Sequence, residues 1–131
     1  MSKPQRRLNY TELNVWKKAI QLSVAVSSAL AGSGFARNPG LRSQLERSAS
    51  SVPSNIAEAE GQPTNRASLR HYFIARGSLN EARSQLVEAI ERSCISKPKY
   101  EELEAIAETT SKLIAGVIKV RKAREENTGK K

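Results

Sequence analysis

The chain has 131 residues, of which 38% are hydrophobic and 27% charged, a composition that fits one globular domain and excludes a disordered or fibrous chain. No apolar run approaches the ~18 residues of a membrane span, and the basic N-terminus lacks the short apolar core of a secretory signal. A single cysteine and a single histidine exclude an internal disulfide and a zinc site, so we expect a cytoplasmic protein without metal or cofactor.

The net charge of +9 is concentrated near the two ends of the chain. Residues 1–10 carry three basic and no acidic residues, and residues 117–131 carry six basic and two acidic residues. Such an excess favours a phosphate-rich partner, and nucleic acid is the first candidate. We expect residues 1–10 to form a flexible basic arm.

The first helix is predicted over residues 11–31, with Thr11 as its N-cap and Gly32 at its end. Its apolar residues form two adjacent ridges at helical spacing: Leu13, Trp16 and Ile20, and Val15, Leu22 and Val26. This face is wider than one seam of a bundle requires, which indicates a subunit interface; a monomer with a generous core is the alternative. Trp16 is therefore expected to pack in the core or between subunits rather than to stack on a base.

The second helix is predicted over residues 40–60. Asn38 can cap it, and Pro39 fits its first turn, where the missing N–H costs nothing. Pro53 lies in its interior, removes the hydrogen bond to the Ala49 carbonyl and is expected to kink the helix.

The third helix is predicted over residues 65–93 and the fourth over residues 98–124, which leaves residues 125–131 as a disordered tail. Their expected apolar seams are Leu69, Tyr72, Ala75, Leu79, Ala82, Leu86 and Ile90, and Leu103, Ile106, Thr110, Leu113, Val117 and Val120. Four such helices with short connections over residues 11–124 predict an all-α protein, an antiparallel up-down-up-down four-helix bundle with a Pro-kinked second helix.

Three segments are distinctive: LNVWKKA at 13–19, LRSQLERSASSVPSNIAE at 41–58 and YFIARGSLNE at 72–81. Together they resemble the bacterial four-helix-bundle family labelled 23S ribosomal RNA intervening-sequence proteins, over about residues 10–120. That family in turn resembles the accessory variability proteins of diversity-generating retroelements. The sequence departs from the family pattern at Ala59, where glycine is usual, and at Glu46-Arg47, where a basic pair is usual.

The resemblance implies a bundle that assembles into homopentamers and has no enzyme activity. For the retroelement relatives it implies binding of nucleic acid, DNA or RNA, and of a reverse transcriptase. Ten basic residues are the resulting candidates for a nucleic-acid interface: Arg6, Arg7, Arg66, Arg70, Arg76, Arg83, Lys119, Arg121, Lys122 and Arg124.

The arginines of the third helix have two interpretations. Arg66 and Arg70 share a face opposite the apolar seam, whereas Arg76 and Arg83 form a second stripe at the edge of that seam. They are either phosphate contacts repeated around a ring of subunits, or solvated charges and salt bridges at the margin of the bundle or oligomer.

Four residues are expected to form a structural motif and not a binding site: Trp16, Pro53, Asn55 and Glu58. We expect the Asn55 amide to bridge backbone groups opened by Pro53, or to reach a neighbouring helix, in preference to contacting a partner. His71 has no nucleophile elbow to accompany it and is expected to be a polar surface residue. The sequence therefore predicts a non-enzymatic oligomeric protein that binds nucleic acid or a nucleoprotein such as a reverse transcriptase complex; the alternative is a protein-interaction scaffold that binds no nucleic acid.

Overall fold

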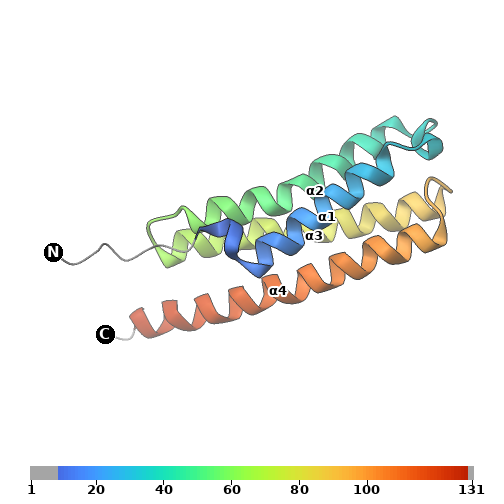
Figure 1. Cartoon of the computed structure of the whole chain (residues 1–131). Helices are drawn as coiled ribbons and strands as arrows, with labels where there is room; N and C mark the ends of the chain where they lie inside the picture. Colours follow the sequence, from blue (N-terminus) through green and yellow to red (C-terminus); the bar gives the residue numbers. More distant parts are fainter. Residues whose placement is uncertain (1–8, 130–131) are drawn as a thin grey trace.

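Four α-helices make up most of residues 9–129, the part of the chain that the computed structural model describes (Figure 1). They are α1 (Asn14–Leu30), α2 (Pro39–Glu60), α3 (Asn65–Glu91) and α4 (Lys97–Gly129), with the 3-10 turns η1 (Tyr10–Glu12) and η2 (Ser33–Phe35) on either side of α1. No strand occurs in residues 9–129, and the predicted all-α four-helix fold is confirmed.

Each helix packs against two neighbours, since α1 contacts α2 and α4, and α3 contacts the same two helices. In Figure 1 the chain reverses direction at every connection, and the helices lie side by side along one long axis. The connections between α1 and α2 and between α3 and α4 meet at one end of the bundle. There Gly34 lies so close to the Cys94 carbonyl that a Cβ at residue 34 would overlap that oxygen, so only glycine fits.

The start of α1 differs from the prediction. Thr11 is not the N-cap of a long helix, because its backbone N–H is hydrogen-bonded to the side chain of Asn9 at 3.1 Å inside the turn η1. The α-helix begins three residues later, after Leu13, whose extended backbone separates the two elements. Residues 1–8 of the predicted flexible arm lie outside the described residues, and Tyr10 belongs to η1.

The second helix begins with Pro39, as its sequence indicates. The Asn38 side chain does not cap it; its amide nitrogen instead lies 3.5 Å from Cys94 Sγ in the connection before α4. Pro53 is buried inside α2, which continues through it as an α-helix to Glu60. The kink at Pro53 stays a prediction.

The fourth helix is longer than predicted, and it ends at Gly129 rather than at residue 124. Residues 125–129 of the predicted disordered tail are therefore helical. The run Lys122-Ala123-Arg124-Glu125-Glu126 consists of strong helix formers, and no glycine or proline interrupts it before Gly129. Residues 130–131 lie outside the described residues.

The buried seam of α4 also differs from the expected one. Its buried residues are Leu103, Ala107, Thr110, Ile114 and Ile118. The expected residues Ile106, Leu113 and Val117 are only partly buried, and Val120 is 50% exposed. The expected seam followed a heptad, whereas a straight helix with 3.6 residues per turn drifts by about 20° in each heptad. The buried Ala107 and Ile114 directly follow the expected Ile106 and Leu113, so the shift by one residue is already present in the first heptad, and drift adds to it only further along, at Ile118.

The core confirms the seam expected for α3 from Leu69 to Leu86 and half of the face expected for α1; at the end of α3 Ala89 is buried and the expected Ile90 is only partly buried. Val15, Leu22 and Val26 are buried, while Trp16 and Ile20 are half-buried at the edge of the bundle. The largest side chains with almost no exposure come from all four helices and η2: Tyr72, Phe35, Leu22, Leu45, Ile56, Leu79, Leu86, Leu103 and Ile114.

Replacing Leu79, which is 0% exposed, with alanine should lower the free energy of unfolding by about 2–5 kcal/mol, because the truncated side chain leaves a cavity in the core of the bundle. The matched control is Val24→Ala on α1, whose side chain is 60% exposed and should cost less than about 0.5 kcal/mol. Urea denaturation followed by circular dichroism measures both. Equal effects of the two substitutions would contradict the packing described above.

Candidate nucleic-acid interface

The candidate basic residues fall on two adjacent helices. Arg6 and Arg7 lie outside the described residues, and the other eight lie on α3 or on the C-terminal half of α4. The helices α3 and α4 pack against each other. In the fold, some of these residues form ion pairs and the others are exposed to solvent.

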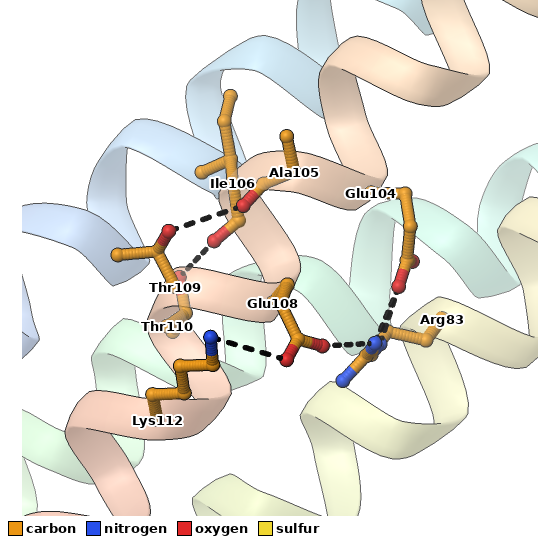
Figure 2. Close-up of polar contacts among 8 residues, drawn as sticks. All are labelled: Arg83, Glu104, Ala105, Ile106, Glu108, Thr109, Thr110 and Lys112. Atoms are coloured by element: carbon orange, nitrogen blue, oxygen red, sulfur yellow. Dashed lines mark hydrogen bonds and ion pairs between the residues drawn. The ribbon is translucent and has the colours of Figure 1, made fainter.

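Arg83 of α3 is held by two carboxylates of α4 (Figure 2). Its Nε donates to Glu104 Oε1 at 3.0 Å, and its Nη2 donates to the same oxygen and to Glu108 Oε2 at 2.7 Å. The hydrogen bond with Glu104 raises the pKa of the Arg83 guanidinium above its ordinary value. Lys112 Nζ lies 3.8 Å from the other Glu108 oxygen. Arg83 thus forms the salt bridge at the bundle margin that was one of its two interpretations.

Arg121 of α4 is ion-paired in a more buried position, at the C-terminal end of α2. Its Nη2 donates to both oxygens of Glu60, at 3.0 and 2.8 Å, and its Nη1 donates to Ser68 Oγ at 2.6 Å. The guanidinium carbon lies 5.3 Å from the centre of the Tyr72 ring. The side chains of Arg121 and Glu60 are only 20% and 17% exposed.

The hydroxyl of Tyr72 completes this contact by donating to the second oxygen of Glu60. Burial raises the pKa of Tyr72 above its ordinary value, and the hydrogen bond and negative charge of Glu60 raise it further. Tyr72 therefore remains a neutral donor at physiological pH. Glu60, Tyr72 and Arg121, here called the ionic anchor, join α2, α3 and α4 at one end of the bundle.

Four exposed cations surround one exposed aromatic ring. The ring of Phe73 on α3 has Arg76 Cζ at 5.2 Å from its centre and Lys122 Nζ of α4 at 5.4 Å. Arg66 and Arg70 precede the ring on the same stripe of α3. Within residues 9–129 none of these four cations pairs with a carboxylate, in contrast to Arg83 and Arg121. We call this group the Phe73 cluster: Arg66, Arg70, Phe73, Arg76 and Lys122.

A shallow hollow lies beside the ring. Ala67, Leu69 and Phe73 give it apolar walls, and the two arginines of the Phe73 cluster at its edge make it basic; its lining residues are Thr64, Arg66, Ala67, Leu69, Arg70 and Phe73. Thr64 is also the N-cap of α3, where its hydroxyl accepts from the N–H of Ala67 at 3.1 Å. The cap thus stabilises the first turn of α3, which lines the hollow.

The two remaining candidates extend the basic surface along α4. Lys119 is exposed one turn before Lys122. Arg124 lines a polar hollow at the end of the bundle together with Arg121 and Glu60.

Sequence reasoning missed Phe73 as a site residue. Its position, directly after the seam residue Tyr72, turns it out of the core, so that 37% of it is exposed. Basic residues three positions before and after it, Arg70 and Arg76, were the available signal, because such residues are neighbours on a helix surface. Lys122 could not be found in this way, since it belongs to another helix.

The motif around Pro53 forms a polar contact between α2 and α3. Asn55 Nδ2 donates to the Ser51 carbonyl and hydroxyl, each at 2.9 Å, and the Ser51 hydroxyl lies 2.8 Å from that of Ser78. Asn55 therefore bonds within its own helix, to Ser51 rather than to the Ala49 carbonyl that Pro53 leaves open. The side chain of Glu58 is exposed.

Trp16 packs beside this segment. Its ring meets that of Tyr10 edge to face, with centres 5.5 Å apart, and it lines a groove that also contains Pro53. This position fits the expected packing role. In the described part of the chain, no three or more His, Cys, Asp or Glu residues are grouped so that they could hold a metal ion. None of the described helices has the length and apolar character needed to cross a membrane.

The chain resembles known proteins in sequence pattern and in fold. The model of the family described as 23S rRNA-intervening sequence protein matches residues 11–116. A crystal structure of a protein with unknown function from the S23 ribosomal protein family of Bacteroides thetaiotaomicron VPI-5482 has a TM-score of 0.73 and 23% sequence identity. The similarity covers 80% of this chain and 98% of that chain, and it concerns the fold alone. None of the curated proteins matches this chain.

Replacing Arg121 with alanine should lower the free energy of unfolding by about 2–4 kcal/mol, because it leaves the largely buried Glu60 carboxylate unpaired. The matched control is Lys119→Ala, an exposed cation two residues earlier on α4, which should cost less than about 0.5 kcal/mol. Denaturant unfolding measures both. A small effect of the Arg121 substitution would contradict the stabilising role of this ion pair.

Proposed function

The chain belongs to the 23S rRNA-intervening sequence protein family, and we propose that it is a non-enzymatic oligomeric protein that binds nucleic acid through the Phe73 cluster. One observation carries the proposal. Two packed helices bring four cations around an exposed ring and, within residues 9–129, give none of them a carboxylate partner, although the nearby Arg83 and Arg121 are fully paired.

Unpaired cations on one surface favour phosphates for an electrostatic reason. Each phosphate that a lysine or arginine neutralises releases condensed counterions, which makes association favourable at low salt. Arginine in addition presents a planar group that matches phosphate with two hydrogen bonds. Contacts of this kind are made with the backbone, so the proposal expects binding with little sequence preference.

The proposal assigns no catalytic role to His71. Its ring nitrogen Nδ1 is buried and has no hydrogen-bond partner within residues 9–129, whereas a general base needs a neighbouring group that orients its ring.

Self-association is the second part of the proposal. A groove along the outer side of α4 has an apolar floor of Leu113, Gly116, Val117 and Val120. Half-exposed valines in such a strip are typical of a contact surface. A homopentamer, the number implied by the resemblance noted above, would repeat the Phe73 cluster around a ring and multiply its phosphate contacts.

The alternative function is a protein-interaction scaffold, and the same α4 groove favours it. Lys112 and Arg124 border the apolar floor, so a helix with an apolar face and acidic flanks would fit there. A partner such as a reverse transcriptase would belong to this class. Binding of a protein partner by nuclease-treated protein that binds no RNA or DNA at ~50 mM salt would favour this function.

Nucleic-acid binding is tested by replacing Arg66, Arg70, Arg76 and Lys122 together with glutamine. In gel-shift titrations the slope of log affinity against log salt should become shallower by about 3, with loss of most binding at ~150 mM salt. The matched control removes four exposed cations elsewhere: Arg37→Gln, Arg42→Gln, Arg47→Gln and Lys97→Gln. Equal losses in the two variants would show that net charge, and not the Phe73 cluster, binds the nucleic acid.

Self-association is tested by light scattering, where the mass should be a multiple of 14.4 kDa, with a pentamer as the expected state. Val120→Lys should shift the protein toward the monomer, because it buries a charge in the proposed contact. Val87→Lys, at a 46% exposed valine on α3, is the matched control and should leave the mass unchanged. A monomer in the unaltered protein would refute this part of the proposal.

A further inference from the structure

The geometry points to an unpaired nucleotide as the ligand of the Phe73 cluster: single-stranded RNA or DNA, with a base placed against the Phe73 ring and its phosphates on the surrounding cations. This inference rests on the proposed function and specifies its ligand class. It concerns one surface, formed by the start of α3 and the end of α4.

The ring of Phe73 is exposed although the core does not require it. Phe73 is 37% exposed on a helix whose seam residues Leu69, Tyr72 and Ala75 are buried, so the fold does not need its ring for the core. A duplex presents phosphates and groove edges to a protein, and cations alone satisfy them. An aromatic ring among those cations adds nothing for a duplex, but it supplies a stacking surface for a base that is free of its partner.

The hollow beside the ring also fits an unpaired nucleotide. Its apolar floor of Ala67, Leu69 and Phe73 fits the flat face of a base, while Arg66 and Arg70 stand where the attached phosphates would lie. The apolar floor therefore complements the base of one unpaired nucleotide, and the basic edge complements its phosphates. In a duplex the base faces are covered by their stacked neighbours and cannot reach the floor.

Cations from both helices lie close to the ring. Arg76 and Lys122 lie at 5.2 and 5.4 Å from the ring centre and come from different helices. On α3 the cluster extends from Arg66 to Arg76, about 15 Å at 1.5 Å per residue, which covers a short run of nucleotides. Arginine side chains beside the ring also offer planar groups on which neighbouring bases stack.

The test measures fluorescence anisotropy of labelled single-stranded RNA, single-stranded DNA and the duplex of the same sequence, each of about 20 nucleotides, at ~50 mM salt. We expect Phe73→Leu to weaken binding of one or both single strands by about 5- to 150-fold, because base–aromatic stacking contributes about 1–3 kcal/mol. Duplex affinity should change less than about twofold. Phe73→Tyr keeps an aromatic ring and should retain single-strand binding.

The matched control is Ile74→Ala, which truncates the next residue on α3, an apolar side chain of 45% exposure. It should leave all three affinities unchanged. Circular dichroism and light scattering on every variant verify fold and assembly. The RNA and DNA arms identify which single strand is the ligand.

Three results would overturn the inference. Single-strand affinity equal to duplex affinity, with no loss in Phe73→Leu, would refute it while leaving the proposed function intact. Dissociation of the oligomer by Phe73→Leu would identify the ring as a subunit contact instead of a base platform. Absence of binding to all three probes by the unaltered protein would refute the proposed function itself.

Discussion

The structure depends on one polar contact at the end of a helical bundle. In the ionic anchor, Arg121 holds both oxygens of Glu60 while Tyr72 donates to the same carboxylate, so three helices meet at three side chains. Such a contact is specific in distance and direction, whereas apolar seams tolerate sliding. By fixing α4 against the first turns of α3, it also determines that Lys122, the next residue, reaches the ring of Phe73. The arrangement of the exposed Phe73 cluster thus depends on the buried ionic anchor.

Much of the fold follows from the sequence by local rules. The existence of all four helices and the start of α2 at Pro39 follow from apolar periodicity and end signals, which act over a few residues. The buried line of α4 could not be predicted by counting heptads, because helical drift and the choice of neighbours decide which residues face inward. The start of α1 depended on Asn9, whose side chain stabilises a turn instead of a longer helix.

The candidate site was less predictable because its character depends on partners far along the chain. Arg83 and Arg76 are one heptad apart and look equivalent in the sequence, yet only Arg83 meets carboxylates, 21 and 25 residues away. Arg121 is separated from Glu60 by 61 residues. No local sequence pattern predicts ion pairs between residues so far apart in the chain. The sequence shows that Phe73 lies outside the apolar seam of α3. It does not show that Lys122 of the neighbouring helix lies beside the ring.

The unequal lengths of α1 and α4 have a dynamic consequence. With 17 and 33 residues, at 1.5 Å per residue, they span about 26 and 50 Å, and in Figure 1 α4 extends beyond the start of α1. Past Arg121 the last turns of α4 have few buried contacts, and segments of that kind open locally at small free-energy cost. Lys122 stands at the base of this stretch. A ligand that engages it must also stiffen the helix, so amide exchange in the final turns would slow on binding, and part of the affinity would be spent as lost conformational entropy.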